Sequence, residues 1–192
     1  MKQTLARELA ESWLSGNKRK LVVWDFDLTL LKVHSYAEGV EPADVAARWK
    51  YDVADLELLR AFVEKGRELG VALGVASFGR AEVINEYLKH MAPGAFRPED
   101  IVTPSNLNLP EVEDGMAVPN GKVMMLELLQ RRHFKGSIGR SSVLFFDDDA
   151  DNVDDCVRAG FTQAFHTPDG FTQGMLASLP TGTQGKRVCL VM

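Results

Sequence analysis

The side chains that could do chemistry stand where three apolar runs of the sequence end. The runs cover residues 21–24, 71–76 and 143–146, and polar residues follow each one directly. These residues are Asp25, Asp27 and Thr29 after the first run, Ser77 after the second, and Asp147 and Asp148 after the third. Carboxylates that gather at one place repel one another and raise each other's pKa values. A divalent cation resolves that conflict, and ligation by oxygen atoms alone favours Mg²⁺.

Lys122 opens a predicted helix ahead of the third apolar run and adds a positive charge to the same set of residues. A metal ion and a lysine beside several carboxylates make a site for a dianionic phosphate group. An aspartate in such a site can serve as a nucleophile. The residue types therefore predict Mg²⁺-dependent chemistry on a phosphorylated compound.

The elements that must position these side chains alternate along the chain. Each of the three runs is short and lacks polar alternation, which is typical of a strand buried on both faces. Short strands are also predicted at 101–102 and 164–166, and residues 31–52 are expected to be loop with at most a short helix. Helices are predicted over 3–15, 54–69 with Gly70 as the C-cap, 80–91, 122–133 and 151–159. This alternation predicts an α/β fold with three layers, in which a Rossmann-like parallel sheet is flanked by helices. Ligands bind beyond the carboxyl ends of such strands, which is where the polar residues lie.

The length and composition of the chain fit one compact domain. The chain has 192 residues, 45% of them apolar and 26% charged, so it can bury a full core. We expect a helical extension over 1–17, the main domain over 18–175 and a tail over 176–192. The net charge of −5 argues against nucleic acid as a partner, because phosphate backbones require clustered Lys and Arg.

Four motifs together resemble a known family. Residues 25–29, with the sequence DFDLT, are similar to the DxDxT signature of the haloacid dehalogenase superfamily. Ser77 resembles the second motif of that family, Lys122 the third, and residues 146–152 the fourth in its DDxxxN form. The motifs come in the family's order, and the resemblance covers about residues 20–167. The sequence most resembles the small capless members, which are magnesium-dependent phosphatases of protein or sugar phosphates.

The resemblance implies a role for each motif residue. Asp25 is expected to attack phosphorus, and Asp27 to protonate the leaving oxygen and then to activate water. The side chains of Asp25 and Asp148 and the main-chain carbonyl of Asp27 are expected to hold Mg²⁺, with Asp147 supporting the metal shell. Roles in phosphate binding fall on Ser77, Phe78 and Lys122.

Two positions of the first motif refine this expectation. Asp27 favours phosphoryl transfer over dehalogenation, because cleavage of a carbon–halogen bond needs no proton on the leaving group. Thr29 is expected to fix the loop geometry rather than to touch substrate. Leu28 stands where many relatives have glycine, a departure that affects the packing of the loop and the reach of Asp27.

The connections between the motifs predict an open site. Residues 30–76 leave room for a flap and a short helical excursion, and residues 78–121 hold too few residues for an α/β cap. An open site suits bulky substrates such as phosphoproteins, or it requires a partner subunit to close it. The oligomeric state stays open at this point.

Other interpretations compete with this one. A response-regulator receiver uses similar residues, but its acidic pair comes first in the chain, whereas here it comes last. A phosphate-binding module without turnover, or one that needs a partner, has the same residues and stays open as the alternative function. Lys135 is the rival of Lys122, although it follows the predicted helix. Asp149 and Asp151 are read as capping or solvated charges, Asn152 as ordering the acidic loop, and His34 and Arg80 as surface residues or substrate contacts.

The two cysteines and the C-terminus bear on location. Cys156 and Cys189 lie far apart in sequence and imply neither a disulfide framework nor a zinc site. Without an apolar leader or a membrane-spanning run, the sequence favours the cytoplasm. Residues 189–192, CLVM, fit a C-a-a-X box for farnesylation, which would allow membrane association. A final apolar strand with an inert cysteine is the alternative.

Overall fold

Five parallel strands form the centre of the protein. The computed structural model describes residues 2–15 and 19–179. The strands are β1 (Leu21–Trp24), β2 (Ala72–Ala76), β3 (Ile101–Val102), β4 (Val143–Asp147) and β5 (Ala164–His166). They lie in the order β3-β2-β1-β4-β5, and every neighbouring pair is parallel. The predicted α/β fold with a Rossmann-like parallel sheet is confirmed.

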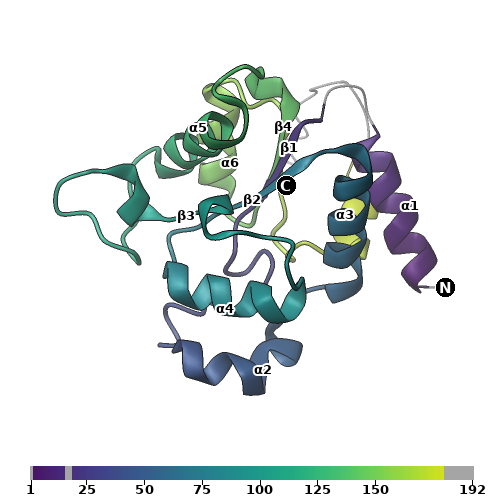
Figure 1. Cartoon of the computed structure of the whole chain (residues 1–192), viewed down its shortest axis with the longest axis horizontal. Coiled ribbons are helices and arrows are strands. Elements are labelled where there is room, and N and C mark those ends of the chain that lie inside the picture. The colour runs from purple at the N-terminus through teal and green to yellow at the C-terminus, as the bar shows by residue number, and fades with distance from the viewer. Residues whose placement is uncertain (1, 16–18, 180–192) are drawn as a thin grey trace, which may run out of the picture.

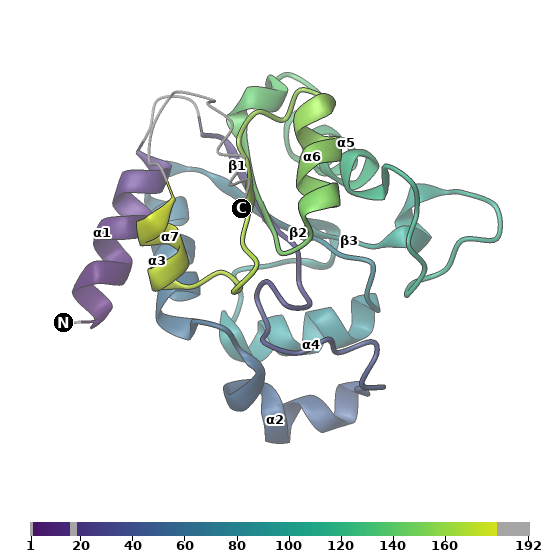
Figure 2. The ribbon, with the colours of Figure 1, turned by 180° about the vertical axis from the view of Figure 1, so that it is seen from behind.

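Helices cover both faces of this sheet (Figures 1 and 2). The α-helices of the described residues are α1 (Lys2–Leu14), α2 (Val45–Asp52), α3 (Leu56–Leu69), α4 (Ala81–Met91), α5 (Gly121–Phe134), α6 (Ala150–Arg158) and α7 (Gln173–Ser178). Residues of α1, α3, α4 and α7 share one core cluster with one face of the sheet, and residues of α5 and α6 share another with the opposite face. The three layers follow from this division.

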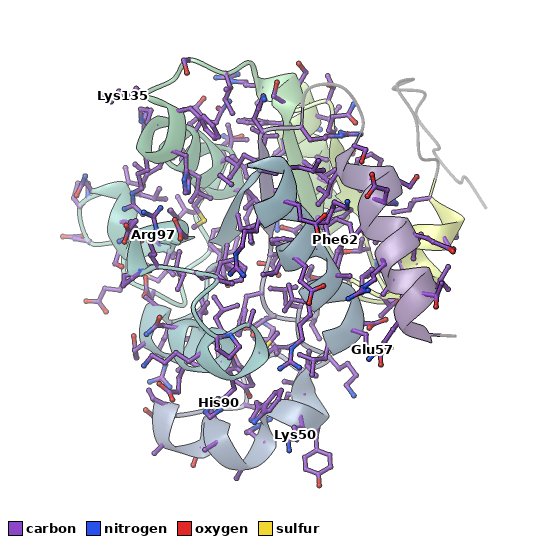
Figure 3. The ribbon with its side chains drawn as sticks, turned by 45° about the vertical axis from the view of Figure 1, so that its right-hand side comes forward. Lys50, Glu57, Phe62, His90, Arg97 and Lys135 are labelled. Atoms are coloured by element: carbon purple, nitrogen blue, oxygen red, sulfur yellow. The ribbon has the colours of Figure 1, made fainter. Side chains whose placement is uncertain are left out.

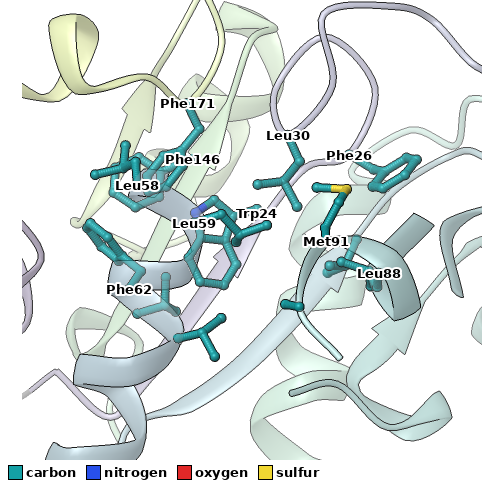
Figure 4. Close-up of a cluster of buried hydrophobic side chains, with 14 of the residues drawn as sticks. Trp24, Phe26, Leu30, Leu58, Leu59, Phe62, Leu88, Met91, Phe146 and Phe171 are labelled. Carbon is teal, nitrogen blue, oxygen red and sulfur yellow. The ribbon is translucent and has the colours of Figure 1, made fainter. Parts of the chain in front are cut away.

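The strands are apolar throughout because both of their faces are covered. In β1, Val22 and Trp24 belong to the cluster under α3 and α4, whereas Leu21 and Val23 belong to the cluster under α5. All four side chains are fully buried. Figure 4 shows part of the first cluster, in which the Trp24 ring lies beside the rings of Phe62 from α3 and Phe171 from the chain after β5.

Local sequence signals explain where the helices begin and end. Asp55 caps α3 by accepting a hydrogen bond from Leu58 N–H at 3.0 Å, and Gly70 ends the helix with φ of 65°. Asp149 caps α6 by accepting from Asp151 N–H at 2.8 Å, as the sequence predicts for this residue. Side-chain oxygens at an N-cap satisfy donors that the first turn of a helix leaves without partners.

Both predicted terminal segments contribute helices that pack on the main domain. Trp13 of α1 is buried, and its ring lies 5.5 Å from that of Phe146 and 4.8 Å from that of Phe165. The predicted boundary at 175/176 falls within α7, whose Leu176 is fully buried. Figure 2 shows α1, α7 and α3 side by side.

The connection from β1 to β2 holds the flap and the short helix that the sequence predicts. Residues 33–41 form an irregular segment that we call the flap, and a 3-10 turn (Pro42–Asp44) leads from it into α2. Figure 1 shows α2 beneath α4, with which it is in contact, on the side away from the sheet. Among the described residues, no helix combines the length and apolar character that a bilayer span requires. The C-a-a-X residues, including Cys189, lie outside the described ranges.

Candidate active site

The sheet register brings the first and fourth motifs together. Trp24 of β1 pairs with Phe146 of β4. Asp25, which directly follows β1, and Asp147, the last residue of β4, therefore lie side by side. Asp25 N–H donates to the Phe146 carbonyl at 2.8 Å, which extends this pairing by one step. One carboxylate oxygen from each of Asp25, Asp147 and Asp148 lies within 4.8 Å of the others. Three carboxylates therefore meet at the carboxyl edge of the sheet.

Lys122 lies among these carboxylates and is almost fully buried. Its Nζ donates to Asp25 Oδ1 and, at 2.7 Å, to the carbonyl of Ala76; Asp147 Oδ2 lies 3.3 Å away. Lys122 thus donates two hydrogen bonds and forms an ion pair with Asp147. The Phe78 ring covers the ammonium, with 4.9 Å between Nζ and the ring centroid. Lys122 thus acts on nearby groups through its charge.

The charges at this edge do not balance. Burial raises the pKa of Asp25 well above its ordinary value, Lys122 opposes that rise, and the neighbouring carboxylates of Asp147 and Asp148 add to it. Burial and the Asp147 carboxylate likewise raise the pKa of Asp148. Burial alone would lower the pKa of Lys122, but Asp147 and Asp25 outweigh it and hold the pKa above its usual value. Three carboxylates face one ammonium, so a further cation would stabilise their ionised forms.

The hydrogen bonds divide the carboxylates into two kinds. Asp147 is fully buried; its Oδ1 accepts from Asp149 N–H at 2.9 Å and from Asn152 Nδ2 at 3.1 Å, while its Oδ2 faces Lys122. Its oxygens are thus already engaged, and Asn152 orders the acidic loop as the sequence predicts. Asp148 is partly exposed, and Oδ2 of Asp25 accepts none of the hydrogen bonds found in the described ranges.

This donor set fits a hard divalent cation. The oxygens not already engaged come from Asp25 and Asp148, with the carboxylate of Asp147 behind them. Thr29 Oγ1 donates to Asp148 Oδ1 at 3.1 Å and accepts from Asp148 N–H at 3.0 Å, so it fixes the orientation of that side chain. Oxygen donors with few carboxylates suit Mg²⁺, which keeps several waters. Asp25 and Asp148 are the residues that would hold it.

The second motif supplies hydrogen-bond donors next to Lys122. Ser77 is buried; its N–H donates to Val102 O at 3.1 Å, and its Oγ accepts from Gly79 N–H at 3.1 Å. The Ser77 hydroxyl hydrogen is left to donate elsewhere. Phe78 N–H donates none of the hydrogen bonds found within the described residues. These two donors are available for the phosphate contacts expected of Ser77 and Phe78, which stay a prediction.

Asp27 lies on the other side of the second motif, against the flap. A Cβ placed on Gly79 would be 3.7 Å from Asp27 Oδ2 and 3.3 Å from Ser77 Oγ, so both side chains lie close to this glycine. Ser35 of the flap donates to Asp27 Oδ1 from its N–H at 3.0 Å and from its hydroxyl at 2.6 Å. The sequence drew attention to neighbouring His34 but not to Ser35, because a lone serine eight residues after Asp27 matches no motif.

Other polar residues lie either beside the acidic residues of the site or far from them. His34 Nδ1 is 3.2 Å from Asp27 Oδ2, whereas Arg80 binds Glu41 and the Val40 carbonyl and so ties the second motif to the flap. Lys135 is exposed at the end of α5, on the outer edge of the molecule, as Figure 3 shows. His166 has its Nε2 2.9 Å from the Asp148 carbonyl, a contact that the sequence gives no reason to expect.

Leu28 adopts a backbone conformation that favours glycine. Its φ is 59°, and its side chain is 40% exposed. A leucine in the left-handed region carries a steric cost of about 1–2 kcal/mol, because its Cβ approaches the following carbonyl. The motif turn is therefore kept in place by the surrounding hydrogen bonds of Asp25, Thr29 and Ser35, and not by the preference of Leu28.

Comparisons with known proteins add no family to this picture. The chain matches no model of a known protein family, and a search of curated proteins finds no similar sequence. The chemistry of the site therefore has to be argued from its own residues.

Proposed function

We propose that this protein is a Mg²⁺-dependent phosphatase of the haloacid dehalogenase type that forms a phospho-aspartyl intermediate on Asp25. The observation that carries the proposal is the buried Lys122, which joins Asp25 to Asp147 beside the partly exposed Asp148. A nucleophilic carboxylate, a fixed positive charge and oxygen ligands for a cation are the groups that phosphoryl transfer to an aspartate requires.

Two half-reactions account for the two aspartates of the first motif. In the first, an oxygen of Asp25 attacks phosphorus, the bond from phosphorus to the ester oxygen breaks, and Asp27 gives its proton to the leaving oxygen. In the second, Asp27 takes a proton from water, whose oxygen attacks phosphorus. Inorganic phosphate leaves, and the carboxylate of Asp25 is restored.

The other residues stabilise the phosphoryl group during both steps. In this proposal the hydroxyl of Ser77 and the N–H of Phe78 donate to phosphoryl oxygens, and Lys122 offsets their negative charge at close range. Bound Mg²⁺ would offset the charge that Asp25, Asp148 and the phosphoryl group share. Asp147 keeps Lys122 and the acidic loop in position through its contacts with Lys122, Asp149 N–H and Asn152.

A cysteine-based phosphatase mechanism is disfavoured by the state of the one described cysteine. Burial raises the pKa of the Cys156 thiol to about 12, and a thiol in that state is a poor nucleophile. A free, buried thiol is compatible with a reducing compartment, and we propose the cytoplasm as the location. Because the β1–β2 connection forms a flap and α2, we propose bulky phosphorylated substrates, phosphoproteins before sugar phosphates.

Hydrolysis of para-nitrophenyl phosphate tests the proposal. Activity is expected with Mg²⁺, and it should vanish with EDTA or in Asp25→Asn. Asp154→Asn, an exposed carboxylate on α6, is the matched control and should retain full activity. Asp27→Asn should hydrolyse the compound about 10²–10⁴ times more slowly, since the variant lacks the carboxyl group that acts as acid and base. After an acid quench, it should also carry the mass of one phosphoryl group.

Two outcomes would count against the proposal. Full activity of Asp25→Asn would show that another residue is the nucleophile. Mg²⁺ and phosphate binding in the wild type, without hydrolysis of any phosphomonoester, would favour the phosphate-binding module as the function.

A further inference from the structure

The carboxylate of Asp27 is held unevenly by the flap. Its Oδ1 accepts two hydrogen bonds from Ser35, one from the N–H at 3.0 Å and one from the hydroxyl at 2.6 Å. Among the described residues, its Oδ2 accepts one long hydrogen bond, from Tyr36 N–H at 3.5 Å, and lies 3.2 Å from His34 Nδ1. The two oxygens of one carboxylate therefore have different surroundings.

This asymmetry decides which oxygen can carry a proton. An oxygen that already accepts two strong donors has little capacity left, so the proton of a neutral carboxylic acid goes to the other oxygen. That other oxygen, Oδ2, is the one near Gly79 and Ser77, where a bound phosphoryl group would lie. The Ser35 contacts point the proton-carrying oxygen of Asp27 towards the reaction.

His34 is a weaker candidate for the same task. Its Nδ1 lies 3.3 Å from Ala37 N–H, from which it accepts a hydrogen bond, so this nitrogen is not free to donate to Asp27. The His34 side chain is 52% exposed, whereas Ser35 is only 3% exposed. A buried donor with two short contacts restricts the carboxylate far more than a half-exposed ring.

We propose that Ser35 is a positioning residue for the acid–base chemistry of Asp27, selecting Oδ2 as the oxygen that exchanges the proton. This inference rests on the proposed phosphatase function. It makes the flap part of the catalytic apparatus, because Ser35 belongs to the flap and contacts Asp27 directly. If Ser35 had a purely structural role, it would only hold the flap against Asp27, and its replacement would change the free energy of unfolding but not the leaving-group dependence of the rate.

The dependence of the rate on the leaving group separates these roles. Para-nitrophenolate leaves readily without a proton, whereas the phenolate of phenyl phosphate leaves poorly unless an acid assists it. The ratio kcat/KM reports only the first half-reaction, in which the leaving group departs. Ser35→Ala removes the hydroxyl donor and should lower kcat/KM for phenyl phosphate by about tenfold or more, the equivalent of one hydrogen bond to a charged group. The loss for para-nitrophenyl phosphate should be smaller. Ser35→Thr keeps a hydroxyl and should recover most of the loss.

A double-mutant cycle with Asp27→Asn makes the test specific. Ser35→Ala should have almost no further effect on kcat once Asp27 is an amide, since the two changes act on one group. Thermal unfolding of each variant shows whether it is folded. If Ser35→Ala does not fold, Ser35→Cys retains a side chain of similar size with a much weaker donor and takes its place.

The results distinguish this inference from the proposed function. If the wild type hydrolyses both compounds and the serine variant loses equal factors of kcat/KM for each, the positioning role is wrong while the phosphatase function stands. The positioning role is also wrong if Ser35→Ala lowers kcat by the same factor in the wild type and in Asp27→Asn. If the wild type hydrolyses neither compound and forms no phosphoenzyme, the proposed function fails, and the role of Ser35 fails with it.

Discussion

Replacement of Lys122 by methionine tests the electrostatic centre of the site most directly. The change keeps the length of the side chain but removes the ammonium that contacts Asp25, Asp147 and the Ala76 carbonyl. Side chains of Lys122 and Asp147 are 2% and 0% exposed, so water cannot replace the lost charge. Breaking a buried ion pair by removing one partner costs about 3–5 kcal/mol. We expect that loss in the free energy of unfolding, measured without metal.

Urea denaturation of the metal-free protein measures this loss, and thermal unfolding should show a fall in Tm of about 6–20 °C for a chain of this length. Lys89→Met is the matched control, because Lys89 forms an exposed pair with Glu86 at 2.8 Å and should lose only about 0–1 kcal/mol. Asp25→Asn in the Lys122→Met background should recover stability by removing an uncompensated charge, with a coupling of about 0.5–3 kcal/mol. A loss as small as that of Lys89→Met, or no coupling to Asp25, would refute the argument.

Three further predictions follow from individual contacts. Leu28→Gly should change the free energy of unfolding by no more than about 1 kcal/mol and leave the motif turn intact. Glycine removes the steric strain at φ of 59°, and this gain offsets the added conformational freedom of the unfolded chain. A larger loss in urea denaturation would mean that the leucine side chain packs against the domain. Tyr87→Phe should destabilise the protein by about 1.5–3 kcal/mol, since the buried Tyr87 hydroxyl donates to the buried carboxylate of Asp52; an unchanged urea midpoint would contradict this. In EDTA, mild acidification from neutral pH should raise Tm more in the wild type than in Asp25→Asn. The pKa of Asp25 is higher in the folded state than in the unfolded chain, so the folded protein binds more protons and gains stability as pH falls through that pKa; equal slopes of Tm against pH in the two proteins would disprove it.

Much of the fold could be predicted because its signals are local. The runs at 21–24 and 143–146 are apolar without alternation, and both are strands covered on two faces. Gly70 ends α3 with a positive φ, as its position after the helical pattern predicts. Helix α7 was missed, because six residues with a single fully buried side chain carry too little periodicity to stand out.

The sequence alone determined which residues could do chemistry at the ends of the strands. Asp25 and Ser77 directly follow apolar runs and Lys122 opens a predicted helix, and both patterns depend only on neighbours along the chain. It also determined the α/β class, because buried parallel strands and amphipathic helices have different periodicities.

Only the tertiary structure decided how these residues interact. The register of β1 against β4 puts Asp25 beside Asp147, and a shift of one residue would separate them. The structure favours Lys122 over Lys135 as the lysine of the site, because Lys122 is buried among carboxylates and Lys135 is exposed. The contact of Ser35 with Asp27 depends on how the flap folds back, and no periodicity along the chain encodes that. Hydrogen bonds between distant segments are set by packing. In the unfolded chain the polar groups of each segment bond to water, so the sequence of one segment does not specify its partner in another.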